Sequence, residues 1–470
     1  MLQPLNSAIA ANRFGLGARP RELAVIGADG RDWLRAQLTT TPLLVDAALR
    51  PSADILAQAL VLQRQIQAAR RGRLANAAAS DAATAAVVQK LPQYLKPIYV
   101  SEVTARFGEA VSCERPFTER LVQFWSNHFA VSVDKQYLAG LAGSFEREAI
   151  RPHVLGSFND LLLSVETHPA MLLYLDNQQS VGPHSQVALR VQRRGGLRRI
   201  GINENLAREI LELHTLGVGG GYTQADVTTF AQVITGWSIG GTGGHPAGAA
   251  DGKFEFRADV HEPGAKLVLG TRYPDSGFGQ GVTVLRDLAH HRSTAHFIAT
   301  KFTRHFVADE PPSPVVERLA HVFMQTGGDL PSVYRALIDS REAWEQPLAK
   351  YKTPLEYIIS GYRGLGLPVD AGRAPLAPFE LLGQRTWQPG SPAGWPDRSA
   401  DWDGASALMK RIEWADAVSQ RLGNGRDAQQ LAPELLGANL TDTTRTAIAH
   451  AATASQALTL LLSAPEFMRR

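Results

Sequence analysis

Apolar residues recur every three to four positions along almost the whole chain, and this spacing restricts the fold more than any other feature. An α-helix has about 3.6 residues per turn, so such spacing places the apolar side chains on one face that must be buried. The clearest segments of this kind are residues 117–130, 158–175, 203–216, 224–235, 293–306, 313–325 and 330–341. We therefore predict a mainly α-helical protein, a large multi-helix domain without a central sheet of five or more strands.

One helix start can be predicted in detail. Thr223 and Asp226 have the spacing of a capping box, in which each side chain accepts a hydrogen bond from the other residue's backbone N–H. We expect this helix to begin near Thr223 and to stop at Gly236.

Four segments interrupt the helical pattern of what we interpret as a single domain covering residues 1–470. Residues 66–90 are rich in alanine and predict a helical excursion or a flexible insertion. Residues 176–200 end in a basic run and predict a loop, which is either solvated or the rim of an anion-binding site. Residues 238–283 hold short apolar runs among Gly, Asp and Pro, which predict a small inserted β-hairpin with its loop. Residues 384–403 contain three Trp and predict an ordered loop packed on the body.

Composition excludes several classes of protein. A net charge of +3 over 470 residues is too small to indicate nucleic-acid binding. No run of 18 apolar residues is present, so we expect no transmembrane segment. Cys113 is the only cysteine, which excludes an intrachain disulfide and a cysteine-based metal site. The given N-terminus has no basic start followed by an apolar core, so we expect a cytoplasmic protein, or an exported one if a leader is missing.

The segment 203–216 carries the most informative polar pattern. On a helical wheel His214 falls within the apolar face, whereas Glu204, Arg208 and Glu212 stack at four-residue steps on the opposite face. This polar stripe is either a surface ladder of ion pairs or a stripe that faces an internal cleft. We predict the second arrangement, with Arg208 bridging both acids.

Two further histidines are candidates for functional residues. His128 lies on the apolar stripe of the helix predicted over 117–130. A single histidine of this kind is more often a core residue than a ligand, but His128 and His214 together indicate one buried polar cluster. We predict that both are buried and hydrogen-bonded. His261 lies in a Gly- and Pro-containing loop, HEPGAKLVLG, which is either ordinary turn chemistry or a functional loop.

Familiar catalytic motifs are absent from the sequence, including HExxH, the phosphate-binding loop and the Glu-x-x-His pair of ferritin-like proteins. The candidate catalytic residues are His128, Glu204, Arg208, Glu212, His214 and His261. Histidines and carboxylates of this kind suit either the binding of a divalent metal or general acid–base chemistry. The cofactor stays open, with a divalent metal as one option.

Several motifs in fixed order resemble a bacterial family known as domain of unknown function 1800. They are FWSNHF (124–129), AMLLYLDN (170–177), NENLAREILELHTLGV (203–218), GYTQADV (221–227), TGW (235–237), HEPGAKLVLG (261–270), KFTRHF (301–306) and SPAGWPD (391–397). The resemblance covers nearly the whole chain, and it implies no established activity. It also implies that related proteins are often exported and often encoded beside a sulfatase-like secreted protein.

The sequence is therefore compatible with two classes of function. The first is an enzyme that performs hydrolytic or redox chemistry on a cell-envelope or extracellular substrate, with a His/Glu/Arg cluster between helices. The second is a non-catalytic accessory protein that assists the export or maturation of the sulfatase-like neighbour. In neither class do we expect nucleic acid as a partner. Two observations separate the enzyme from the accessory protein. One is metal analysis of the purified protein, and the other is whether the polar residues converge on a pocket.

Overall fold

Helices make up most of the structure. The computed structural model describes residues 5–44, 46, 48–75, 90–194, 201–242, 251–345, 348–370 and 375–470. Within these residues, the strands form only two small antiparallel sheets of two strands each. The predicted mainly α fold with a small β insertion is therefore confirmed.

The elements follow one another along the chain in this order. The N-terminal half contains α1 (Leu5–Ile9), α2 (Glu22–Ile26), α3 (Gly30–Ala36), α4 (Ser52–Ala75), α6 (Lys90–Ser112), α7 (Pro116–His128), α8 (Leu138–Phe145), α9 (Phe158–Thr167), α10 (Pro169–Tyr174), α11 (Gln186–Arg193), α12 (Asn205–Glu209) and α13 (Gln224–Val233). The strands are β1 (Trp237–Ile239), β2 (Phe254–Phe256), β3 (Lys266–Val268) and β4 (Thr271–Tyr273). The C-terminal half contains α14 (Phe278–Ala289), α15 (Arg292–Phe306), α16 (Ser313–Gln325), α17 (Leu330–Asp339), α18 (Glu342–Glu345), α19 (Pro354–Leu365), α20 (Leu376–Leu382), α21 (Ala405–Leu422), α22 (Ala428–Leu436), α23 (Asp442–Ala449), α24 (Ala454–Ser463) and α25 (Pro465–Met468).

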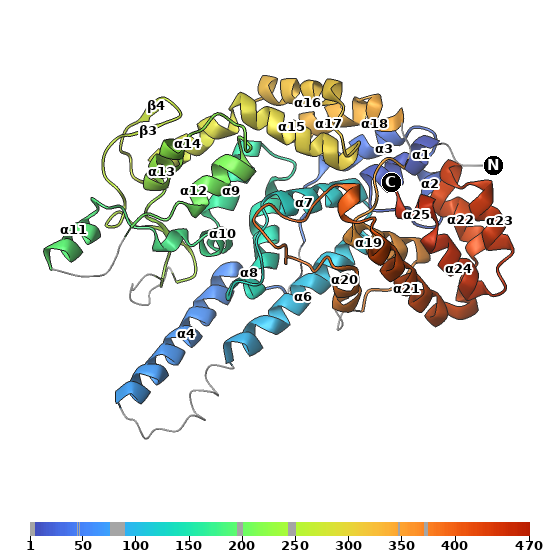
Figure 1. The fold of residues 1–470 in the computed structure, drawn as a ribbon, viewed down its shortest axis with the longest axis horizontal. Helices are drawn as coiled ribbons and strands as arrows, with labels where there is room; N and C mark the ends of the chain where they lie inside the picture. The colour runs from blue at the N-terminus through green and yellow to red at the C-terminus, as the bar shows by residue number, and fades with distance from the viewer. Residues whose placement is uncertain are drawn as a thin grey trace.

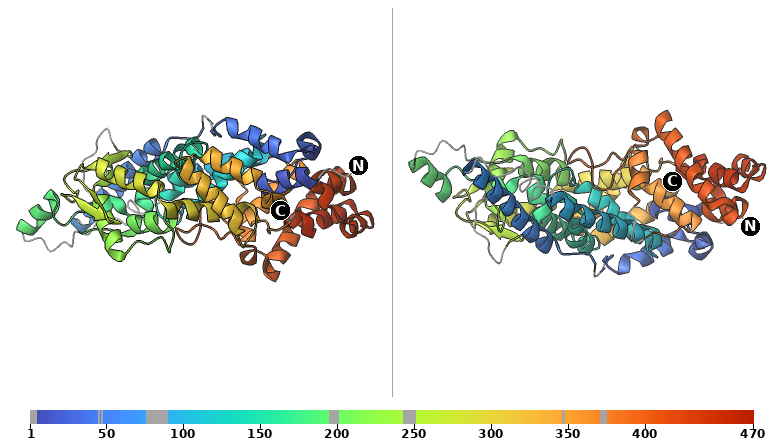
Figure 2. Two further views of the ribbon diagram at one scale, coloured as in Figure 1. Left: turned by 90° about the horizontal axis from the view of Figure 1, so that it is seen from above. Right: turned by 90° about the horizontal axis from the view of Figure 1, so that it is seen from below.

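The two ends of the chain lie side by side. In Figure 1 the first helices, α1 to α3, share the right-hand end of the elongated molecule with α22 to α25, and the views of Figure 2 agree. The strands and α11 occupy the opposite end, and α4 and α6 project from the body as an arm. The middle of the molecule is formed by α7, α15 and α19, which come from distant parts of the chain.

Helix α7 runs through the core. Pro116 opens it at a position that needs no backbone N–H, and all but one of its residues are buried. The indole Nε1 of Trp125 donates a hydrogen bond of 2.7 Å to the hydroxyl of Tyr334 on α17. Phe124 stacks on Phe302 of α15 with ring centroids 4.3 Å apart. Aromatic packing therefore holds α7 against α15 and α17.

The inserted β structure differs from the single hairpin expected over 238–283. Strands β1 and β2 pair antiparallel across residues 240–253, part of which lies outside the described residues. Strands β3 and β4 form a separate hairpin. Its two-residue turn, Leu269 and Gly270, has φ values of 49° and 76°, the left-handed conformations that a tight antiparallel turn needs. Helix α14 already begins at Phe278.

Some expected boundaries shift for local reasons. The helix expected over 158–175 divides into α9 and α10 at Pro169, because proline cannot donate the helical hydrogen bond. The segment 176–200, expected as a loop, contains α11, whose first turn is capped by the Ser185 hydroxyl, and residues 195–200 lie outside the described part of the chain. The Ala-rich segment 66–90 belongs to α4 up to Ala75, and residues 76–89 lie outside the described part of the chain.

The capping box at the start of α13 is confirmed. The Thr223 hydroxyl accepts from the backbone of Asp226, and the Asp226 carboxylate accepts from the backbone of Thr223. The helix ends at Val233, three residues before the expected Gly236, and the chain then turns into β1.

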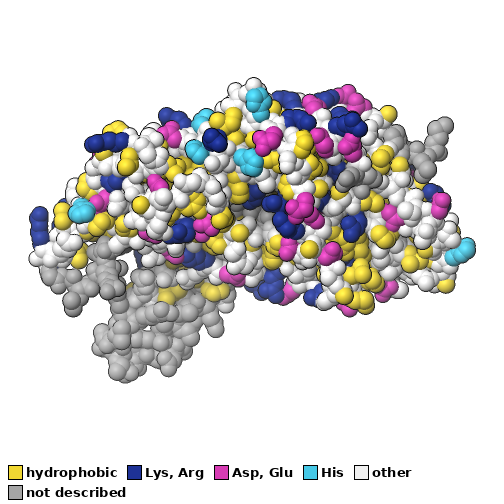
Figure 3. Space-filling view, turned by 45° about the horizontal axis from the view of Figure 1, so that its top comes forward, with side chains coloured by type: hydrophobic (Ala, Val, Ile, Leu, Met, Phe, Trp, Pro, Cys, Tyr) yellow, Lys and Arg dark blue, Asp and Glu magenta, His cyan; other side chains and the backbone are white. Residues whose placement is uncertain are grey.

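The surface and the helix lengths agree with the composition. On the described part of the face in Figure 3, basic and acidic side chains are mixed rather than gathered into an extended patch of one sign. Within the described residues, every helix is too short or too polar to span a bilayer.

Candidate functional site

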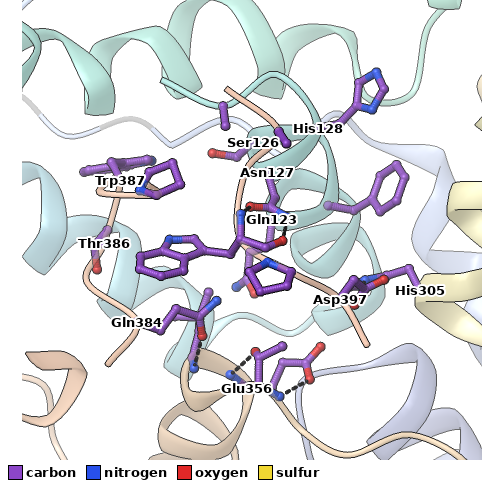
Figure 4. Close-up of a pocket in the computed structure, with 18 of the residues that line it drawn as sticks. Gln123, Ser126, Asn127, His128, His305, Glu356, Gln384, Thr386, Trp387 and Asp397 are labelled. Carbon is purple, nitrogen blue, oxygen red and sulfur yellow. Dashed lines mark hydrogen bonds and ion pairs between the residues drawn. The ribbon is translucent and has the colours of Figure 1, made fainter. Parts of the chain in front are cut away.

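A cavity of about 350 Å³ opens where α7, α15 and the start of α19 meet the Pro- and Trp-rich loop that follows α20. Figure 4 shows this cavity with Gln123, Gln384 and Trp387 around it. Its lining residues are Arg106, Gln123, Phe124, Ser126, Asn127, His128, Ala130, Val131, Lys301, Arg304, His305, Thr353, Leu355, Glu356, Gln384, Arg385, Thr386, Trp387, Pro389, Ala393, Trp395, Pro396, Asp397, Arg398 and Asp401. A volume of this size accommodates a small organic molecule.

The loop that forms one wall is held firmly against α7. The Asn127 side chain donates to the carbonyl of Trp395 (2.9 Å) and accepts from its N–H (2.7 Å). At Gly394, where φ is 81°, an added Cβ would lie 2.3 Å from the Asn127 carbonyl oxygen, so only glycine fits. Trp387 also has a left-handed φ of 51°, which is unusual for a bulky residue. Backbone strain of this kind is often found at functional sites.

A histidine and a carboxylate pair on the cavity wall. The Nδ1 atom of His305 on α15 lies 3.1 Å from the Asp397 carboxylate. An ionised carboxylate can only accept a hydrogen bond, so Nδ1 carries the proton. Burial lowers the pKa of His305 to about 4. Burial alone would raise the pKa of Asp397, but His305 and Lys350 beside it lower that pKa to about 2. At neutral pH the pair is therefore a neutral imidazole oriented by an ionised carboxylate.

Buried ion pairs form the floor of the cavity. Glu356 of α19 pairs with both Arg120 and Arg470, the latter at 3.0 Å. Burial would raise the pKa of Glu356, but the two guanidinium groups hold it well below its usual range. Glu356 also completes a capping box with Thr353, which fixes the start of α19. The floor is therefore rigid and charged.

The predicted burial of His128 and His214 is confirmed, at 1% and 0% exposure. The predicted hydrogen bonds are also present. His128 Nε2 donates to the His214 carbonyl at 3.1 Å, and His214 Nδ1 lies 2.7 Å from the Glu166 carboxylate. Burial lowers the pKa of His128 well below its usual value. Although His128 borders the cavity, Figure 4 shows its ring turned away from it.

The predicted cleft around Glu204, Arg208 and Glu212 is wrong. The side chains of Glu204 and Arg208 are 31% and 39% exposed, and Glu212 is also only half-buried. Arg208 pairs with Glu204 at 3.0 Å and with Gln224 at 2.9 Å, whereas Glu212 accepts instead from the hydroxyl of Tyr222. The stripe is a partly solvated ladder of ion pairs and hydrogen bonds.

A local change of helix type contributes to this difference. Residues Ile210–His214 form a π-helical turn, in which hydrogen bonds span five residues rather than four. The regular wheel that stacked Arg208 under Glu212 therefore does not hold over the last turn. The pKa of Glu204 is lowered first by the Thr228 hydroxyl that donates to it, and then by Gln224 and Arg208.

His261 lies apart from the other candidates. It is buried against Phe256, and its Nδ1 lies 2.8 Å from the carbonyl of Thr235. It therefore helps to hold the loop between β2 and β3 and does not line the cavity. Within the described part of the chain, no group of three or more His, Cys, Asp or Glu side chains has the arrangement of a metal site.

Of the six predicted residues, the structure brings His128 and His214 together in the core and Glu204 and Arg208 together near the surface, and only His128 borders the cavity. The prediction missed His305, Asp397 and Lys301. All three lie within segments that carried the family resemblance, KFTRHF and SPAGWPD. The four-residue spacing of Lys301 and His305, which places them on one helix face, was the available local signal.

Comparison with known proteins gives one match. A family model described as a protein of unknown function, DUF1800, covers residues 9–469. No curated protein and no solved structure matches the chain.

Proposed function

The chain belongs to the DUF1800 family, whose function is unknown, and we propose that it is an enzyme that performs general acid–base chemistry on a small molecule bound in the cavity. The single observation that supports this proposal is the pair formed by His305 and Asp397 on the cavity wall. A neutral histidine whose second nitrogen is free is the group that proteins use most often to take up a proton.

The geometry gives each member of the pair a role. With its Nδ1 proton donated to Asp397, His305 presents a lone pair at Nε2, which has no hydrogen-bond partner among the described residues. His305 would accept a proton from the bound molecule, or from a water that attacks it, and return that proton to the leaving group. Asp397 would hold the tautomer and stabilise the imidazolium that forms.

The buried cluster of His128, His214 and Glu166 lies at the C-terminal end of α7 and does not take part in this proposal as a reacting group. Its rings pack against Phe129, whose centroid is 5.2 Å from that of His214. We assign it the role of fixing the C-terminal end of α7, from which Asn127 holds the cavity loop.

The test compares the parent with His305→Gln and with Asp397→Asn. Each purified protein is incubated with a small-molecule extract of bacterial cells, and the consumption of individual compounds is followed by mass spectrometry. The parent should consume at least one compound, and His305→Gln should lower that rate by about 10²-fold or more. Asp397→Asn should also slow it, because the amide does not enforce the same tautomer.

A matched control is available on the same helix. His296 of α15 is exposed, with its Nε2 3.6 Å from Glu317, so His296→Gln should leave the rate unchanged. Circular dichroism of each variant checks that the fold is retained. Equal consumption by the parent and His305→Gln, or no compound consumed by the parent, would contradict the proposal.

A further inference from the structure

Two cations on the cavity wall form no ion pair within 4 Å among the described residues, although the carboxylate of Asp397 is near enough to Lys301 to raise the pKa of that lysine in part. Lys301 and Arg304 lie three positions apart on α15 and both line the cavity. Among the described residues, the Lys301 ammonium lies over the ring of Phe297, 5.6 Å from its centroid. Arg304 donates from Nε to the carbonyl of Asp309 at 3.4 Å. Burial lowers the pKa of Lys301 to about 8, so at pH 7 it remains mostly protonated.

The other cations of the lining are already paired. Arg106 pairs with Glu146 at 2.7 Å, Arg385 with Glu380, and Arg398 with Glu310 at 3.3 Å. Lys301 and Arg304 are therefore the lining cations whose charge is available to a ligand. Asp401 is an exposed carboxylate of the lining, and solvent screens it from the interior.

The floor of the cavity does not compensate these charges. Arg120 and Arg470 share the carboxylate of Glu356, and Arg470 also lies 4.0 Å from the carboxylate of Asp397. Lys352, directly before α19, is 1% exposed and has no hydrogen-bond partner for its ammonium among the described residues. The charged groups behind the cavity therefore place no excess negative charge beside Lys301 and Arg304, and a low-dielectric surrounding strengthens the field of those two cations.

Neutral donors and an apolar wall complete the site. Gln123 Nε2 and Trp387 Nε1 are buried N–H donors of lining residues with no acceptor among the described residues, and Figure 4 shows both residues around the cavity. A bound oxyanion would supply acceptors to both donors. Phe124, Trp395 and Pro396 add apolar surface to the lining.

From these observations we propose that the cavity binds a molecule with a dianionic oxyanion head, of the phosphate-monoester class, attached to an apolar ring. The inference rests on the proposed function in that it concerns the same cavity. Lys301 and Arg304 would bind the two negative charges, Gln123 and Trp387 would donate to the oxygens, and Trp395 would pack on the ring.

The test uses phenyl phosphate as the probe at pH 7.5, where it carries close to two negative charges. Benzenesulfonate has a similar size and a tetrahedral head with a single charge. Titration calorimetry should give a Kd at least about tenfold lower for phenyl phosphate. Lys301→Met and Arg304→Met should each raise the Kd for phenyl phosphate by about tenfold or more.

Two further variants locate the binding. Arg385 lines the same cavity but already pairs with Glu380, so Arg385→Met should change the Kd less than about threefold. Trp395→Leu should weaken phenyl phosphate binding and leave inorganic phosphate binding unchanged. Lys301→Met removes a charge that makes no close ion pair and should fold at least as well as the parent, which thermal melting verifies.

The outcomes separate this inference from the proposed function. Equal Kd values for the two probes, no binding of phenyl phosphate, or a parental Kd in Lys301→Met would overturn the dianion inference. If His305→Gln still abolishes the consumption of a compound, the proposed function survives that failure. Conversely, phenyl phosphate binding could depend on Lys301 while His305→Gln leaves turnover unchanged. That result would support the proposed ligand class and contradict the catalytic role of His305.

Discussion

The replacement of Arg151 by alanine should destabilise this protein more than almost any other single loss of charge. Arg151 is fully buried and makes two hydrogen bonds of 2.7 Å to the carboxylate of Glu119 and one of 3.0 Å to that of Glu146. Its loss leaves Glu119 without a cation in the core, whereas Glu146 keeps Arg106 at 2.7 Å. Breaking a buried pair in this way costs about 3–5 kcal/mol.

Arg208→Ala is the matched comparison, because Arg208 also makes an ion pair with a glutamate but is 39% exposed. Its loss should cost less than about 1 kcal/mol, since water solvates both partners once they separate. Urea unfolding followed by far-UV circular dichroism gives both values under identical conditions. The reasoning predicts a gap of about 2 kcal/mol or more between the two variants.

A double variant separates lost charge from lost packing. Combining Arg151→Met with Glu119→Leu replaces the buried pair by apolar side chains, and such replacements are often neutral or stabilising. The double variant should therefore be more stable than Arg151→Ala. Equal unfolding free energies for Arg151→Ala and Arg208→Ala would refute the argument from burial.

Three other predictions follow from single features. Burial lowers the pKa of Lys352 from 10.5 to about 7, so Lys352→Met should stabilise the fold at pH 7 by on the order of 4 kcal/mol. That gain should shrink as the pH rises from 7 toward 10.5 in urea titrations, because the penalty is full below the folded pKa and absent above the unfolded one. Thr223→Ala removes one half of the capping box with Asp226 and should cost about 1 kcal/mol in the same assay; an unchanged midpoint would show that the cap is dispensable. For any compound that the parent consumes, kcat/KM should fall as the pH drops through about 4, where His305 gains its second proton; a rate independent of pH down to 3 in a protein that is still folded would exclude His305 as the base.

Local patterns were enough to predict most helices and the burial of particular side chains. The starts of α7, α13 and α16 lie within a few residues of the predicted ones, because caps and apolar periodicity act over a few residues. His128 and His214 were placed correctly for the same reason, since exposing either would also expose its apolar neighbours. The division of the insertion into two small sheets could not be predicted, because it depends on which short strands find partners.

The polar face of residues 203–216 shows where such patterns stop being informative. The sequence contains both a stripe of Glu204, Arg208 and Glu212 and, elsewhere, the separate residues Arg151 and Glu119. An arginine buried between two acids was predicted for Arg208, but the structure has this arrangement at Arg151. A charged stripe has the same spacing whether water or another helix covers it, so spacing alone does not decide burial.

The sequence by itself determined that the chain is helical, that one short stretch forms β structure, and that two histidines are buried, because each of these depends on neighbours within a few turns. Only the tertiary structure decided which side chains share a cavity. His305 and Asp397 are 92 residues apart, and Arg120 and Glu356 are 236 residues apart. Such pairs form when whole helices and the 384–403 loop pack together, and no local period in the sequence encodes which distant carboxylate will meet which cation.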